Sequence, residues 1–166
     1  MPIALLICTM SMAQNAMFIP FGLPLKKVQN SLQEKDYIKR VSYESEIIES
    51  KVNHRQVIRY HMKRDILFAI EDERIYLNKK EAERVIQTCV EYMGRGNRKA
   101  KVLSNKGGVT RWGMVETDRV LELVVSKKKI TKKKFEYLVV LKATSRFHGP
   151  RGETEELASA IIDRMN

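Results

Sequence analysis

The sequence has few cysteines, the residues from which a disulfide framework is built. It contains only two cysteines in 166 residues. Cys8 lies in an apolar run and Cys89 on the apolar side of a predicted helix, so we expect buried free thiols and no disulfide framework. Since disulfides belong to oxidising compartments, we expect a reducing, cytoplasmic environment.

Motifs of the common enzyme classes are also lacking. The three histidines, which have no metal-ligand spacing, are His54, His61 and His148. No glycine-rich nucleotide-binding loop or nucleophile motif is found. The nearest hint is Asp36 followed by Glu49 and Lys51, which weakly resembles the carboxylate pattern of metal-dependent nucleases. A solvated face explains that pattern better. We therefore expect a non-enzymatic protein with no cofactor and no metal, and keep a nuclease as the weaker alternative.

No charged residue precedes Lys26. A membrane helix needs about 20 mainly apolar residues, and polar residues near position 14 and the breakers Pro20, Gly22 and Pro24 argue against one. A secretory signal would need a basic start, which is missing. Met12 offers an alternative initiator, which would remove residues 1–11. We expect an irregular apolar arm over residues 1–25, followed by a single domain over residues 26–166.

Two helices are predicted from their spacing of apolar residues. Over residues 78–94, Asn78 can cap the start and Gly94 the end. The second predicted helix spans residues 155–165, with Thr154 as its cap. Its expected buried stripe is Leu157, Ile161, Ile162 and Met165.

The region between residues 31 and 63 carries conflicting periods. Helical spacing and strand alternation overlap up to about residue 50, and we favour a helix there. Residues 55–62 alternate as a strand with Ile58, Tyr60 and Met62 on one side. Residues 66–70 and 74–77 indicate a strand pair or one bent strand. Lys106–Gly108 indicates a turn.

Two further strands, residues 119–125 and 135–142, flank a lysine-rich segment. Matching their apolar faces pairs Val125 with Tyr137 and Leu123 with Val139, and centres an open, mobile tip on Thr131. The predicted fold is α+β: a mainly antiparallel β-sheet with helices packed on one side and a long basic β-hairpin.

Charge is concentrated in one stretch. The chain is 43% hydrophobic and carries a formal charge of +11. Residues 95–134 hold thirteen Lys or Arg against three acidic residues, so almost all of the excess lies there. A concentrated basic stretch is the footprint of a polyanion-binding protein. The candidate nucleic-acid-binding residues are Arg95, Arg98, Lys99, Lys101, Lys106, Arg111, Trp112, Lys127, Lys128, Lys129, Lys132, Lys133 and Lys134.

These residues favour a nucleic-acid-binding protein that grips the phosphate backbone largely independently of sequence. Trp112 beside Arg111 could stack on an unpaired base, which favours single-stranded DNA or RNA; packing of Trp112 into the core is the competing interpretation. The alternative function is a membrane-associated basic protein whose residues 1–25 insert while lysines hold anionic lipid. An edge strand or the apolar arm offers a route to an oligomer, which nothing in the sequence specifies.

Overall fold

One antiparallel sheet of eight strands dominates the computed structural model, which describes residues 19–31, 37–41, 46–94, 99–132, 134–149 and 152–164. The strands are β1 (Tyr37–Val41), β2 (Glu46–Asn53), β3 (Gln56–Lys63), β4 (Ile66–Tyr76), β5 (Lys101–Lys106), β6 (Val109–Val115), β7 (Arg119–Lys129) and β8 (Phe135–Ser145). The described helices are α2 (Leu25–Ser31), α3 (Lys79–Met93) and α4 (Glu153–Ile162). The fold is therefore α+β, with the sheet as its larger part.

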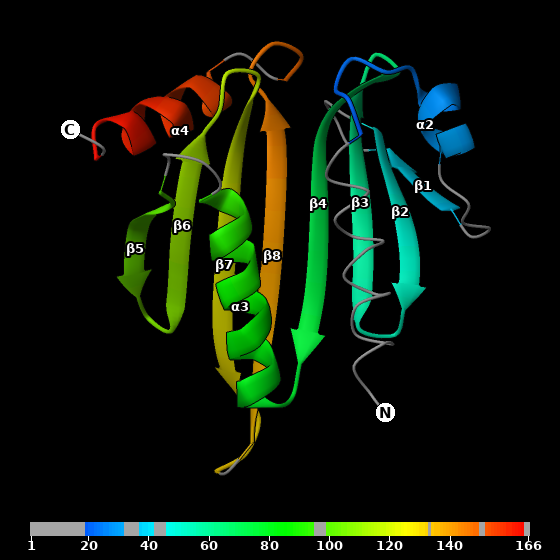
Figure 1. The fold of residues 1–166 in the computed structure, drawn as a ribbon. Helices are drawn as coiled ribbons and strands as arrows, with labels where there is room; N and C mark the ends of the chain where they lie inside the picture. Colours follow the sequence, from blue (N-terminus) through cyan, green and yellow to red (C-terminus); the bar gives the residue numbers. More distant parts are fainter. Residues whose placement is uncertain are drawn as a thin grey trace.

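The sheet consists of two four-stranded meanders. Its spatial order is β1-β2-β3-β4-β8-β7-β6-β5, so β4 at the end of the first meander pairs with β8 at the end of the second (Figure 1). Helix α3 connects the two meanders and lies across β7 and β8, with contacts to β4. Each meander is followed by one helix, α3 after the first and α4 after the second.

Helix α3 confirms the strongest sequence prediction. The Asn78 side chain accepts hydrogen bonds from the backbone N–H of Lys80 at 2.9 Å and of Glu81 at 3.5 Å. These bonds satisfy two of the amide groups that a helix start leaves free. The helix buries Ala82, Val85 and Met93 against the sheet.

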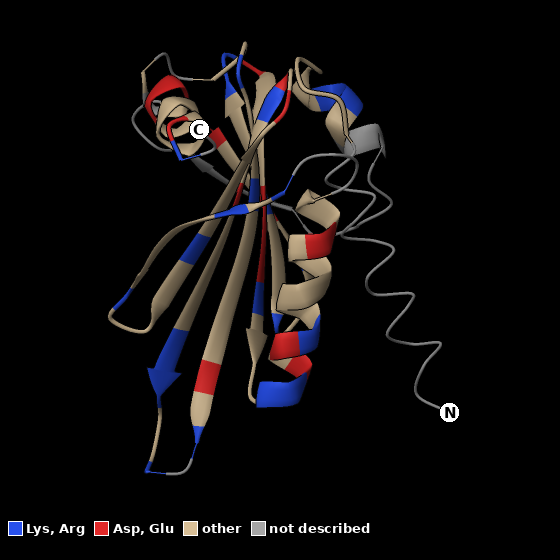
Figure 2. Cartoon of the chain, turned by 60° about the vertical axis from the view of Figure 1, so that its left-hand side comes forward, with Lys and Arg blue, Asp and Glu red and all other residues tan. Residues whose placement is uncertain are grey.

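The expectation that the helices pack on one side of the sheet is wrong for α3 and α4. Leu121 and Leu123 of β7 share a core cluster with α3, whereas Val120 packs with Ala158 and Ile161 of α4. Neighbouring residues of a strand point to opposite faces, so the two helices cover opposite faces of the sheet, as Figure 2 shows.

A glycine in β6 explains where α4 docks. A Cβ atom added to Gly113 would lie 2.6 Å from Cδ1 of Ile161 and 2.8 Å from Cδ1 of Leu103. Glycine inside a strand often marks such a close approach. The sequence pattern was interpreted only as a turn around Lys106–Gly108. That turn is confirmed, since Gly107 and Gly108 have φ values of 62° and 78°, but the strands β5 and β6 on either side of it were missed.

The start of α4 also differs from the prediction. Gly152, with φ of 108°, holds the N-cap position, and no side-chain cap bond forms there. Thr154 is 7% exposed and lies inside the helix. Leu157 and Ile161 pack as expected, but Ile162 is 42% exposed; Met165 lies outside the described residues.

The helix predicted up to residue 50 is wrong, because β1 and β2 occupy that stretch. Here the alternating period outweighs the helical one, since β2 can pair with β3 along most of its length. Strand β3 is confirmed, with Ile58, Tyr60 and Met62 all buried. The segments at 66–70 and 74–77 form one strand, β4, whose pairing with β3 shifts between His61 and Met62.

Part of the predicted N-terminal arm is bonded to the chain at the start of β4. The backbone N–H of Gly22 donates to the Leu67 carbonyl at 3.0 Å, and that of Leu25 donates to Asp65 at 2.9 Å. Ile19 is buried, and Phe21, Leu23 and Leu25 pack against the same core. A boundary placed by charge alone therefore does not coincide with the edge of the packed structure.

A buried ion pair lies on the face of the sheet that α3 covers. Asp72 is 4% exposed, and Arg74 donates from Nη2 to its Oδ2 at 2.7 Å. Gln56 donates from Nε2 to the other Asp72 oxygen at 3.0 Å. Burial raises the pKa of the neighbouring Cys89 thiol to about 11, so this thiol is protonated near neutral pH.

Removing the carboxylate should leave a buried cation unpaired. We expect Asp72→Leu to lower the free energy of unfolding by about 3–5 kcal/mol, as measured by urea titration. The double variant Asp72→Leu/Arg74→Met removes both charges and should recover most of that loss. Equal stability of the single variant and the unmodified protein would contradict a desolvated pair.

Candidate nucleic-acid interface

The β7–β8 hairpin extends beyond its neighbours. Strand β4 stops pairing with β8 at Tyr137, and β6 stops pairing with β7 at Ser126. Beyond Ser126, the Lys127 N–H of β7 still donates to the Gly108 carbonyl, in the turn between β5 and β6, at 2.9 Å. Pairing between β7 and β8 continues to Lys129 opposite Phe135. The described residues 128–132 and 134–136, here called the lysine ribbon, project from the sheet (Figure 1).

The ribbon ends in a hydrogen-bonded turn, where an open tip was predicted. The Ile130 N–H donates to the Lys134 carbonyl at 2.9 Å, and the Lys134 N–H donates to Oγ1 of Thr131 at 3.1 Å. The strands also pair two residues out of the predicted register, since Val125 lies opposite Val139 and not Tyr137. The turn is therefore centred on residue 132.

Aromatic rings support the base of the ribbon. Nζ of Lys127 lies 4.1 Å from the ring centroid of Phe135 and 5.8 Å from that of Tyr137. A cation over an aromatic face is attracted by the ring quadrupole. These contacts tie Lys127 of β7 to the neighbouring strand β8 at the base of the ribbon.

Lysines surround the ribbon. Along β7 Lys127 and Lys129 point to one face and Lys128 to the other, because strand side chains alternate. Lys132 and Lys134 stand at the turn, and all five side chains are exposed. The sequence between Glu122 and Glu153 contains a single acidic residue, Glu136. Positive charge is therefore locally in large excess.

Further cations missed by the sequence interpretation share this end of the molecule. Tyr76 pairs with Tyr137 near the base of the ribbon, and α3 begins three residues after Tyr76, at Lys79. Lys79 and Lys80 therefore lie at the same end of the sheet as the ribbon (Figure 2). Lys106 adjoins the glycine turn that bonds to Lys127. Only the strand topology, which brings the ends of β4, β5 and β7 together, could have identified this grouping.

Other predicted site residues lie elsewhere. Lys101 pairs with Gly113, four residues along β6 from the glycine turn, and Lys99 precedes it. Nη1 of Arg111 lies 3.7 Å from Oε1 of Glu122, so the charge of Arg111 is partly compensated. Arg95, Arg98 and Lys133 lie outside the described residues.

Trp112 and Arg111 do not form a joint site. They are neighbours in β6, so their side chains point to opposite faces of the sheet. Trp112 is partly buried and packs against the main core cluster. The core interpretation of Trp112 therefore fits the geometry, and the basis for preferring unpaired strands is removed.

The face of the sheet opposite α3 carries a row of charges of alternating sign. Glu49, Arg59, Glu71, Lys142 and Glu122 occupy adjacent positions on five neighbouring strands, alternating in sign. Arg59 donates to Glu49 at 2.9 Å and to Glu71 at 2.7 Å. The charges of this row offset one another, unlike those of the ribbon.

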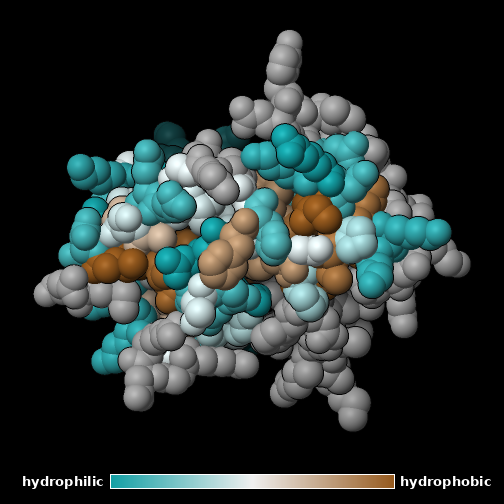
Figure 3. All heavy atoms as spheres, turned by 90° about the horizontal axis from the view of Figure 1, so that it is seen from above, coloured by the Kyte–Doolittle hydropathy of each residue, from teal (hydrophilic) through white to brown (hydrophobic). Residues whose placement is uncertain are grey.

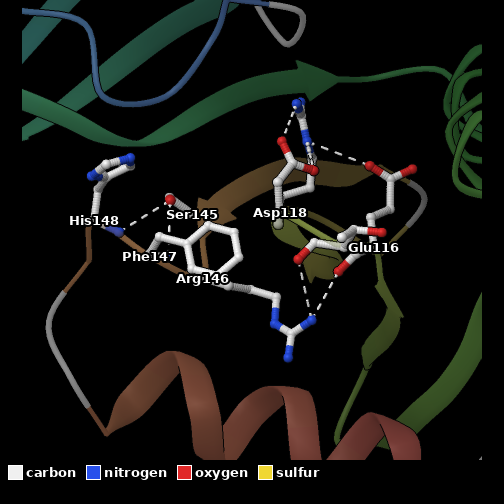
Figure 4. A network of polar contacts seen from close by, with 8 residues as sticks. Glu116, Asp118, Ser145, Arg146, Phe147 and His148 are labelled. Carbon is white, nitrogen blue, oxygen red and sulfur yellow. Dashed lines mark hydrogen bonds and ion pairs between the residues drawn. The ribbon is translucent and has the colours of Figure 1, made fainter.

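Two arginines at the end opposite the ribbon are likewise engaged. Arg146 donates to the carbonyls of Glu116 at 3.2 Å and Thr117 at 3.3 Å, and Arg119 to Asp118 at 2.8 Å (Figure 4). The bond from Arg119 lowers the pKa of Asp118. Seen from above, this end mixes hydrophobic and hydrophilic residues (Figure 3).

The described residues offer no cluster of three or more His, Cys, Asp or Glu side chains that could hold a metal ion. Glu49, part of the weak nuclease-like pattern, is bonded to Arg59, and Asp36 lies outside the described residues. None of the described helices is long and apolar enough to cross a membrane. Comparisons with protein-family models, curated proteins and solved structures find no match to this chain.

The charge row should make stability depend on acid pH. His61, 3.7 Å away, and Arg59 lower the pKa of Glu71 from 4.5 to about 2. The stabilisation from Glu71 is therefore full above its unfolded pKa of about 4.5 and is lost as the pH falls towards 2. Urea midpoints measured between about pH 5.5 and 2.5 should fall more gently in Glu71→Gln. Parallel curves for the two proteins would contradict this assignment.

The assignment of Trp112 can be tested beside Arg111. Trp112→Ala should cost about 2–3 kcal/mol of stability, because a large partly buried side chain is removed. Arg111→Ala should cost under about 1 kcal/mol, since its ion pair is exposed. Urea unfolding measures both. A Trp112→Ala protein with unchanged stability and reduced affinity only for single strands would place Trp112 in the interface.

Proposed function

We propose that this chain is a non-enzymatic nucleic-acid-binding protein that grips phosphates through the lysine ribbon, largely independently of sequence. The expected cytoplasmic location belongs to the same proposal. The observation that carries it is the projection of the lysine ribbon, whose described residues include four lysines and one glutamate, beyond the paired sheet. A cationic arm that stands clear of the core can meet phosphate without disturbing the fold.

The balance of charge elsewhere supports the ribbon as the contact surface. The Arg59 guanidinium is paired with three carboxylates within the sheet, and Arg146 and Arg119 are bonded at the opposite end. Lysine is a point charge without the planar fork of arginine, so a lysine cluster suits phosphate contacts better than base recognition. Lys80 and Lys106 extend the positive field around the base of the ribbon, whereas Lys79 is paired with Glu83 at 3.3 Å.

The test replaces Lys128, Lys129, Lys132 and Lys134 with Ser and measures binding to labelled nucleic acid over a range of salt concentrations. Each phosphate contact contributes about 0.9 to the slope of log affinity against log salt on duplex DNA and about 0.7 on single strands. We expect weaker binding to every sequence and a slope reduced by up to roughly three units. The melting temperature should hardly change, because all four side chains are exposed.

A matched control removes the same charge elsewhere. Lys26, Lys27, Lys51 and Arg84 are exposed and lie outside the ribbon. Their replacement with Ser should leave the salt slope unchanged. If both variants lose affinity equally, net charge and not the ribbon drives binding. If the ribbon variant keeps its affinity and slope, the proposal is wrong, and binding of anionic vesicles alone would favour the membrane-associated alternative.

A further inference from the structure

The dimensions of the lysine ribbon match one kind of nucleic-acid groove. From Lys127, which still bonds to Gly108, to Lys129 at the end of β7, the hairpin runs roughly 7 Å at about 3.3 Å per residue, and the turn stands beyond it. A sheet layer with its side chains is about 10 Å thick. The major groove of B-form DNA is about 12 Å wide and about 8.5 Å deep, whereas the minor groove is only about 6 Å wide. The ribbon can therefore reach the floor of a major groove while the sheet stays outside.

The distribution of charge suits a groove better than a flat surface. Lys129 and Lys128 point to opposite faces of the ribbon. A membrane surface would meet only one of these faces, and the other cations would stay in water. The phosphates on the two walls of a groove can meet both faces at once.

One residue at the tip is not explained by phosphate binding. Ile130 is 50% exposed, although it stands among lysines at the start of the turn. The bond from its backbone N–H to the Lys134 carbonyl helps to close the turn, and this bond does not require an apolar side chain. On the floor of a major groove, the apolar group available to such a side chain is the methyl group of thymine.

We propose that the ribbon enters the major groove of B-form duplex DNA, with lysines on both phosphate walls and Ile130 against thymine methyl groups on the floor. This inference rests on the proposed function and specifies its ligand. Single strands offer no groove, and the major groove of duplex RNA is too narrow for side chains to read. The expected preference is thus for thymine-containing duplex DNA.

The experiment compares three proteins on matched ligands. The full-length protein, Ile130→Ser and Ile130→Val are titrated against an alternating A·T duplex and the same duplex with deoxyuridine in place of thymidine, which lacks only the methyl group. Duplex RNA, single-stranded DNA and anionic phosphatidylserine vesicles complete the set. Thermal unfolding checks that each variant is folded.

We expect the unmodified protein to bind the thymine duplex roughly three- to tenfold more tightly than the uracil duplex, the factor for covering the exposed half of an isoleucine. Ile130→Ser should bind both duplexes alike, and Ile130→Val should keep most of the preference. The salt slope should be the same for all three proteins, because no phosphate contact is removed. Duplex RNA and single strands should bind more weakly.

Failure of this inference can be told from failure of the proposed function. Equal affinity for thymine and uracil duplexes, or tighter binding of duplex RNA or single strands, overturns the groove assignment while nucleic-acid binding stands. A salt slope lowered by Ile130→Ser would also overturn it, since the tip would then be needed for phosphate contact. Binding to vesicles with no binding to any nucleic acid would overturn both.

Discussion

The antiparallel pairing of β4 with β8 is the constraint on which the rest of the structure depends. These strands end the two meanders, and eight residue pairs from Ala69–Thr144 to Tyr76–Tyr137 join them into one sheet. The pairing creates a continuous apolar face for α3, which leaves β4 and packs on β7 and β8. It also determines which part of the β7–β8 hairpin projects from the sheet. Strand β4 ends at Tyr76 and turns into α3, while β8 begins two residues before the partner of Tyr76, so the ribbon extends past its neighbours.

Charge is used in two different ways across this sheet. On the face opposite α3, carboxylates and cations alternate over five strands, and Arg59 bonds three carboxylates, Glu49, Glu71 and Glu73. Such pairs are partly buried, and their charges compensate one another. At the ribbon the cations have only Glu136 nearby in sequence, and the cost of crowding them is reduced because water surrounds them. The excess positive charge counted over residues 95–134 therefore does not form one surface. It divides between compensated positions such as Arg111 and the exposed lysines.

Patterns that are local in the sequence predicted much of this structure. The predictions that failed concerned how distant segments lie relative to one another. The helix after Asn78 and the strands on either side of the lysines were predicted because cap and periodicity are local. The side of the sheet that α4 covers could not be predicted from the sequence, since it depends on Gly113 lying under Ile161. Apolar matching identified which faces of β7 and β8 agree, but a shift of two residues preserves that agreement, so the local pattern could not decide the register. The same reasoning applies to the candidate site. Composition indicated the lysines, whereas the proximity of Arg111 and Trp112 along the chain was misleading, because a strand points them apart.

The ribbon is supported at both ends, and this matters for how a ligand would act on it. Like charges on two paired strands repel, which favours separation of the strands, although salt screens exposed charges beyond about 8 Å under physiological conditions. The contact of Lys127 with the Phe135 ring opposes separation at the base, and the bonds between Lys134 and the turn oppose it at the tip. Between these points strand pairing holds Lys128 opposite Glu136. An anionic ligand would neutralise the repulsion that the fold tolerates, so binding and ordering of the ribbon should reinforce each other. A preformed cationic ribbon also loses less conformational freedom on binding than a flexible lysine loop would. Its closed turn is therefore a structural reason for contact with a polyanion to be effective.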